Sequence, residues 1–235
     1  MTTLEQRGLA PVRSVLDNGV RVIAKHSGAT PAVTVHASFG AGTVFDPPHQ
    51  PGVAHFVSRT IDRGTASHTA EEIAERLDYR GVALAITVNR HAFSLVCTCL
   101  VEDLDHILDT IADIVMHPAF SDREVETRRG EIVTMIRQDE DNPAAMAAEG
   151  LLSLLYGPAH PYGRRPRGTV ETAERISRSS LQGFHGGLHR RHMPAPEVRR
   201  RAASVPARGA PRSRPRRRNR SRACDAPQCA PSRTR

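Results

Sequence analysis

The sequence predicts an α+β fold in which helices pack on one face of a mainly antiparallel sheet. Three observations indicate this class. The first 40 residues have strand patterns, a second pair of strands follows midway along the chain, and helices with recognisable caps lie between and after them. No internal repeat is evident.

The strands are expected from turn signals and from alternation. Asp17-Asn18-Gly19 between two β-rich segments predicts a hairpin, and Gly40-Ala41-Gly42 ends the next strand. In the last strand, alternation places Phe93, Leu95, Cys97 and Cys99 on one buried face. The expected strands are residues 12–16, 20–26, 32–39, 82–88 and 92–100.

The helices are expected from their caps and apolar stripes. Thr69 with Glu72, and Ser121 with Glu124, have the spacing of capping boxes, and Gly81 stands where a helix C-cap glycine belongs. The helix that begins at Pro143 has Leu151, Leu152 and Leu155 as its apolar residues. The expected helices are residues 69–81, 104–115, 121–141, 143–157 and 180–192.

The charge of the chain is concentrated at its C-terminal end. The net charge is +8, but residues 197–235 hold 13 arginines against Glu197 and Asp225. Residues 1–196 therefore carry 20 basic and 23 acidic side chains, a net charge of −3. Lys25 is the only lysine in the chain. So strong a preference for arginine is better explained by GC-rich coding DNA than by selection for binding. We expect no nucleic-acid surface on the body of the protein.

The sequence divides into three parts. Residues 1–11 are expected to be a flexible N-terminus, residues 12–194 a single domain, and residues 195–235 a disordered tail. After Pro196 the chain contains no Leu, Ile, Met or aromatic residue, so this part cannot contribute to a core. Its Arg, Ala, Pro, Ser and Gly residues share GC-rich codons, and we hypothesise that it is read in a shifted frame. A basic arm that binds RNA or DNA is the alternative.

Neither a signal peptide nor a membrane span is indicated. The N-terminal segment has no apolar core, and no run of about 18 apolar residues occurs. We therefore expect a cytoplasmic protein. Cys97 and Cys99 lie two apart in an extended segment, too far for a good bridge, and are expected to be reduced core residues.

Several separated motifs occur in a characteristic order. They are "LDNGVRVI" at 16–23, "GVAHF" at 52–56, "RGT" at 63–65, "TAEEI" at 69–73, "DNP" at 141–143, "HPYGRRPRGTVET" at 160–172 and "LQGFH" at 181–185. This order resembles the N-terminal domain of the insulinase-like metallopeptidases, the inverzincins, a family that includes pitrilysin and the mitochondrial processing peptidase. The resemblance covers about residues 12–194 and implies the fold of that domain.

The resemblance also implies where a catalytic zinc site would lie. Members of this family bind zinc with His-x-x-Glu-His on one helix and a Glu about 76 residues later. Here the first histidine is His55, but the base position is Ser58 and the second ligand position is Arg59. The third ligand position falls at Met135. A serine is no general base near pH 7, and a guanidinium has no lone pair for zinc. A thioether is a poor ligand beside nitrogen and oxygen donors.

Other metal sites have less support. Glu131, one helical turn before Met135, is an alternative ligand, but with His55 it falls short of the three protein ligands that catalytic zinc takes. His185, His189 and His192 have helical spacing, but Gly186 and Gly187 weaken that helix. We expect no metal and no catalytic residue.

The expected function is that of a non-catalytic insulinase-family homologue. It would bind peptides or act as the partner of a catalytic subunit in a heterodimer, in line with pairs in which an inactive relative helps to enclose the substrate. The alternative is a zinc metalloendopeptidase that acts on peptides with His55 as a ligand. A truncated product without function is a third reading.

Overall fold

Two small sheets and seven α-helices make up the described part of the protein. The structure, a computed structural model, describes residues 11–27, 30–190 and 199–200. In chain order its elements are β1 (Val12–Val15), β2 (Arg21–Ala24), β3 (Ala32–Phe39), η1 (Thr43–Phe45), α1 (Val53–Thr60), α2 (Ala70–Asp78), β4 (Ala85–Val88), β5 (Phe93–Leu100), η2 (Val101–Asp103), α3 (Leu104–Met116), α4 (Asp122–Glu140), α5 (Pro143–Tyr156), η3 (Pro161–Gly163), α6 (Val170–Arg175), α7 (Arg178–Arg190) and β6 (Arg199–Arg200).

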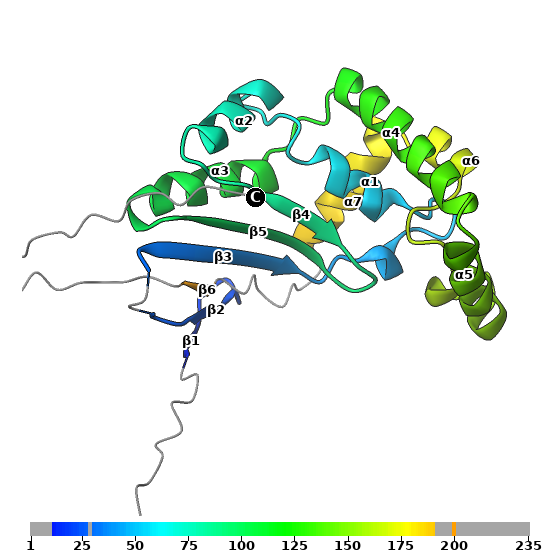
Figure 1. Ribbon diagram of the computed structural model, residues 1–235, viewed down its shortest axis with the longest axis horizontal. Helices are drawn as coiled ribbons and strands as arrows, with labels where there is room; N and C mark the ends of the chain where they lie inside the picture. The colour runs from blue at the N-terminus through cyan, green and yellow to red at the C-terminus, as the bar shows by residue number, and fades with distance from the viewer. Residues whose placement is uncertain (1–10, 28–29, 191–198, 201–235) are drawn as a thin grey trace, which may run out of the picture. The chain divides into compact units, whose positions relative to one another are not determined.

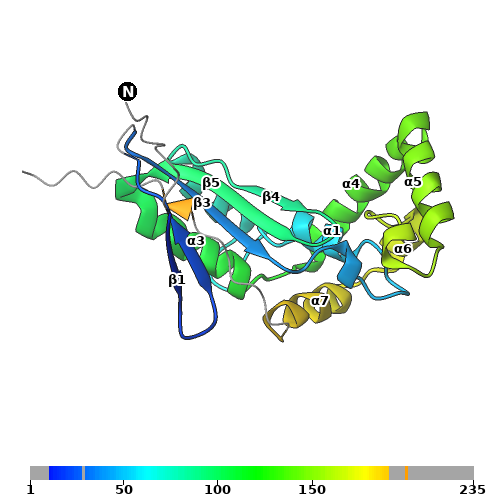
Figure 2. The ribbon, with the colours of Figure 1, turned by 90° about the horizontal axis from the view of Figure 1, so that it is seen from below.

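The larger sheet has the order β3-β5-β4, and both of its strand pairs are antiparallel (Figure 1). Its buried face consists of alternate residues of β3 and β5, and α3 packs along it (Figures 1 and 2). The residues between them are half-buried or exposed, so one face of this sheet forms the core. The α+β prediction is confirmed. The buried residues are Val33, Val35, Ala37, Phe39, Phe93, Leu95, Cys97 and Cys99.

The predicted hairpin forms at the start of the chain. β1 and β2 pair antiparallel, and Gly19 adopts a φ of 81°, which favours glycine. The Asn18 side chain accepts a hydrogen bond from the Val20 N–H at 3.1 Å. Arg199–Arg200 adds a short parallel strand beside β2. The rest of the predicted tail lies outside the described residues, so its disorder and shifted frame stay predictions.

The cap of α2 explains a correction to one predicted strand. Thr69 and Glu72 form the expected reciprocal capping box. At the other end Gly81 has a φ of 63°, and the Val82 N–H donates to the Leu77 carbonyl at 2.9 Å, as in a Schellman motif. Val82 is therefore part of the C-terminal cap of α2, and the strand predicted from residue 82 begins only at Ala85, the first residue of β4.

The C-terminal helices differ in detail from the prediction. Helix α6 was not predicted because its capping box pairs Thr169 with Thr172, where the usual signature has Glu or Gln. Helix α7 begins two residues earlier than predicted, and it ends at Arg190. The helix predicted from Pro143 forms as α5, but Leu151 and Leu155 are 57% and 67% exposed.

Two further predictions concern cysteines and membranes. Cys97 and Cys99 are free and buried, as predicted. Within residues 11–27 and 30–190, no helix has both the length and the hydrophobicity that crossing a bilayer requires.

Candidate functional site

Helix α1, which carries the candidate site, begins at a glycine that the sequence analysis did not explain. Gly52 has a φ of 97°, and a Cβ there would lie 2.4 Å from the Arg167 carbonyl oxygen. Gly168 has a φ of 76°, and its Cβ would lie 2.3 Å from the Pro51 carbonyl oxygen. Two backbone segments thus cross in direct contact, which requires glycine in both. This contact brings the "GVAHF" and "HPYGRRPRGTVET" motifs together.

A carboxylate outside α1 caps its first turn. The two carboxylate oxygens of Asp46 accept hydrogen bonds from the N–H groups of Gly52 and Ala54, at 2.7 and 3.0 Å. Burial raises the pKa of Asp46 to about 6, although these N–H groups and the charge of Arg164 act in the opposite direction. Asp46 lies six residues before Gly52, beyond a Pro-Pro pair, so the spacing of an ordinary N-cap could not reveal it.

His55 lies at the centre of the candidate site and is neutral near pH 7. Burial, followed by the positive charges of Arg167 and Arg59, lowers its pKa to about 4, while Asp139 acts in the opposite direction. Its Nε2 atom is buried and has no hydrogen-bond partner among the described residues. A neutral imidazole of this kind can donate a lone pair or a proton from Nε2, depending on its tautomer.

Ser58 and Arg59 both have partners within the protein. Ser58 is buried, and its hydroxyl donates to the His55 carbonyl at 2.7 Å, one turn earlier in the helix. Arg59 Nη2 lies 3.5 Å from Glu131 Oε2 on α4. Glu131 also accepts from Arg128 Nη1 at 2.5 Å. Partial burial acts to raise the pKa of Glu131, but the hydrogen bond and charge of Arg128 prevail and lower it.

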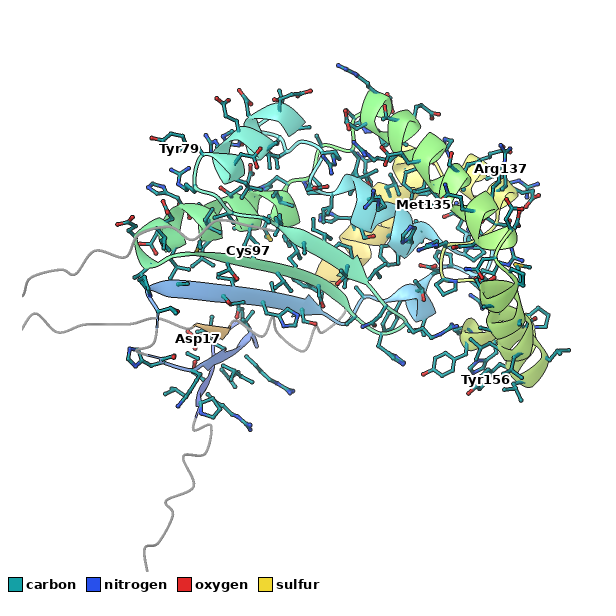
Figure 3. The ribbon with its side chains drawn as sticks, in the orientation of Figure 1. Asp17, Tyr79, Cys97, Met135, Arg137 and Tyr156 are labelled. Carbon is teal, nitrogen blue, oxygen red and sulfur yellow. The ribbon has the colours of Figure 1, made fainter. Side chains whose placement is uncertain are left out.

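One face of α4 lines the other side of the candidate site. Glu131, Met135 and Asp139 are four residues apart and therefore share this face. Glu131 pairs with Arg59, and Asp139 forms an ion pair with Arg167. Met135 is partly buried and packs against the core, on the helix that runs beside α1 (Figure 3). The structure thus brings His55, Arg59, Glu131 and Met135 to one helix pair.

A zinc ion does not fit this set of side chains. Catalytic zinc takes three His, Cys, Asp or Glu ligands, and here the positions beside His55 hold a guanidinium and a thioether. Glu131 already binds two arginines. Over the residues with described placements, no group of three or more His, Cys, Asp or Glu side chains could hold a metal ion. The assignment of Ser58, Arg59 and Met135 to the family's base and ligand positions stays a prediction.

Helix α1 is also held by an arginine that the sequence analysis did not single out. The Arg129 guanidinium on α4 lies over the Phe56 ring, with its central carbon 5.5 Å from the ring centroid. It donates to the Ala173 carbonyl and, at 2.8 Å, to the Ile176 carbonyl at the end of α6. One side chain therefore links α1, α4 and α6.

Of the second predicted histidine cluster, the structure describes the side chain of His185. His185 is buried, and its Nε2 lies 2.7 Å from the Val115 carbonyl oxygen, so that nitrogen donates a hydrogen bond. Its ring packs edge-on against Phe120. This is a structural role. The side chain of His189 and all of His192 lie outside the described residues.

Comparisons of the sequence with known proteins agree on one family. A sequence model described as "Insulinase (Peptidase family M16)" matches residues 21–161, more than half of the chain. An uncharacterized zinc protease of Mycobacterium leprae is 30% identical over 185 residues, which are 76% of this chain and 40% of the relative. The mitochondrial-processing peptidase subunit beta of Caenorhabditis elegans is 23% identical over 171 residues, 73% of this chain and 37% of that protein. The chain thus spans about 40% of the length of these curated relatives.

Solved structures share the fold. A peptidase M16 inactive domain from Pseudomonas fluorescens matches with a TM-score of 0.71 and 22% identity, over 75% of this chain and 43% of that one. Pitrilysin matches with a TM-score of 0.72 and 18% identity, over 86% of this chain and 22% of its own. Together with the sequence match, these findings show that the chain belongs to the insulinase family of peptidases, family M16.

Proposed function

We propose that this protein is a non-catalytic member of the insulinase family, which binds peptides or a partner subunit and does not cleave them. One observation carries the proposal. The guanidinium of Arg59 pairs with Glu131 on α4, and the family resemblance assigns the position of Arg59 to the second zinc ligand, where a lone-pair donor is needed. A permanent positive charge at that point repels a divalent cation, and Ser58 donates its hydroxyl to the backbone.

An edge strand next to α1 supports the peptide-binding part of the proposal. β4 pairs with β5 on one side only, and no described strand pairs with its other side. An unpaired strand edge offers N–H and carbonyl groups to an extended peptide. α1 packs next to β4, so a peptide added there would pass the side chains of the candidate site. Ile86 and Val88 are half-buried, whereas Ala85 and Thr87 are exposed.

Family membership supports the partner part. Members of the family often work as paired subunits, and one relative is named as a subunit of the mitochondrial processing peptidase. We propose a catalytic insulinase-family subunit as the partner. A cytoplasmic location is part of the same proposal.

The alternative is a zinc endopeptidase in which His55 is a ligand. Its support is the neutral, unpartnered Nε2 of His55 and the zinc proteases among the relatives. Metal analysis of the purified protein, and peptide cleavage with and without a chelator, separate the two functions. We expect no stoichiometric zinc and no chelator-sensitive cleavage; finding both would overturn the proposal.

Matched variants test the reasoning about the ligand positions. Arg59→His alone should not bind zinc, because it supplies only a second ligand. The triple variant Ser58→Glu, Arg59→His, Met135→Glu should bind about one zinc per chain. The same variant with Ile136→Glu in place of Met135→Glu is the control, because Ile136 is buried in the core and should not accept a carboxylate. Zinc bound equally by both triple variants would refute the assignment of Met135.

Peptide binding is tested separately by fluorescence anisotropy with labelled, unstructured peptides. Saturable binding is expected. If none of a varied peptide set binds at concentrations up to about 1 mM, which corresponds to less than about 4 kcal/mol of affinity, the peptide-binding part fails.

A further inference from the structure

The outward face of α5 is a continuous apolar surface. At 100° per residue, Ala144, Ala147, Ala148, Leu151, Leu154 and Leu155 fall within an arc of about 120°. All six are exposed, and Leu154 is 87% exposed. No side chain of this helix is buried. Its one charged residue, Glu149, lies on the opposite side and pairs with Arg165 at 2.9 Å.

This surface is unusual for an exposed helix. Single exposed apolar side chains are normal, but a contiguous patch without polar interruption marks a contact surface. α5 packs against α4 and η3 with its other side, and Figures 1 and 2 show it at the margin of the described elements. The six side chains are therefore available to another molecule.

The order of the side chains along α5 indicates what that molecule is. The first half of the face carries three alanines and the second half three leucines. Two such helices in antiparallel orientation place the leucines of each on the alanines of the other. A parallel pair would place leucine on leucine and leave a gap between the alanines, which costs contact. We propose that α5 binds α5 of a second copy of this chain, antiparallel about a twofold axis between Glu149 and Gly150.

The register follows from this axis. Leu155 opposes the partner's Ala144, and Leu151 opposes the partner's Ala148. The two helix dipoles run antiparallel, which is the favourable orientation.

The covered area is about 500 Å² per chain, or roughly 1,000 Å² in total, at the lower limit for a specific interface. The dimer should therefore form at micromolar concentrations. This inference does not depend on the proposed function.

Sedimentation equilibrium of the full chain, in reducing buffer so that cysteines do not cross-link, tests the proposal. Wild type should dimerise with a Kd of about 1–100 µM, and Leu151→Glu should weaken the dimer at least about tenfold. Tyr79→Glu is the matched control. Tyr79 directly follows Asp78, the last residue of α2, and is 87% exposed, so this change should have no effect on the dimer.

A size exchange tests the orientation. Ala148→Leu should weaken the dimer, because it opposes leucine to leucine, and the double variant Ala148→Leu, Leu151→Ala should restore it. Circular dichroism shows whether each variant is folded, and exposed positions should tolerate these changes. A wild type that is monomeric at 200 µM would overturn the proposal, as would a dimer that Leu151→Glu leaves intact. Failure of the double variant to recover would overturn the antiparallel register.

Discussion

Replacement of His55 by Gln tests the electrostatics of the candidate site. The folded protein holds the pKa of His55 at about 4, against 6.5 for an exposed histidine. Because the folded-state pKa is lowered, the unfolded chain binds the proton more readily. The stability contributed by the neutral ring is complete above about pH 6.5 and is lost as the pH falls toward 4.

The magnitude follows from the two pKa values. At pH 5 an unfolded histidine is almost fully protonated and the folded one is about one-tenth protonated. Protonation then stabilises the unfolded chain by about 2 kcal/mol relative to the folded protein. Between pH 8 and pH 5, wild type should therefore lose about 2 kcal/mol more than His55→Gln, which has no titrating ring.

Urea unfolding followed by circular dichroism at several pH values measures this difference. Asp46, whose raised pKa makes it act in the opposite direction as the pH falls from about 6 to 3.8, is common to both proteins and cancels. His106→Gln, at an exposed position of α3, is the matched control for the replacement of a histidine by glutamine. Parallel profiles for wild type and His55→Gln would show that the folded protein accepts the proton on His55 freely, and would refute the reasoning.

Five further substitutions test contacts within the fold by their cost in unfolding free energy, measured by urea denaturation. Gly52→Ala should cost at least about 3 kcal/mol, because a methyl group there collides with the backbone and the φ is unfavourable. Gly81→Ala has an unfavourable φ but open space around it, and should cost about 1 kcal/mol. Equal costs would contradict the crossing of the two backbones. Asp113→Ala should cost about 1–3 kcal/mol, since this carboxylate accepts hydrogen bonds within the fold, the shortest at 2.6 Å. An unchanged free energy of unfolding would contradict a stabilising role for these hydrogen bonds. Arg129→Ala should cost about 2 kcal/mol and Arg59→Ala less than about 1 kcal/mol, and the reverse order would refute the reasoning about helix contacts.

Features encoded within a few residues were predictable from the sequence. The hairpin at Asn18 and Gly19 and the capping box of Thr69 depend on neighbouring residues, and the alternation of β5 reports its buried face directly. The family motifs also placed His55 on a helix. These signals are local because the groups that interact lie within one turn or one strand pair.

Features that join distant segments could not be predicted in the same way. Asp46 caps α1 from across a loop, and Gly52 meets Gly168 only because the fold brings their segments together. The periodicity of α5 shows an apolar face but not whether the protein covers it, and Leu154 turns out to be exposed. Such contacts depend on tertiary packing, which overrides local patterns.

The contacts around α1 show how two helices of this fold can be held together by packing. In a zinc-binding member of the family the metal would join the helices that here are α1 and α4. In this protein the ion pair between Arg59 and Glu131 spans the same gap, but it is long and about 40% exposed, so it contributes little stability. The helices are held instead by fully buried side chains such as Phe56 and Ile132, and by Arg129, which binds the end of α6. Packing and not coordination therefore sets the distance between these helices, so a change at the proposed ligand positions need not move α1 away from β4.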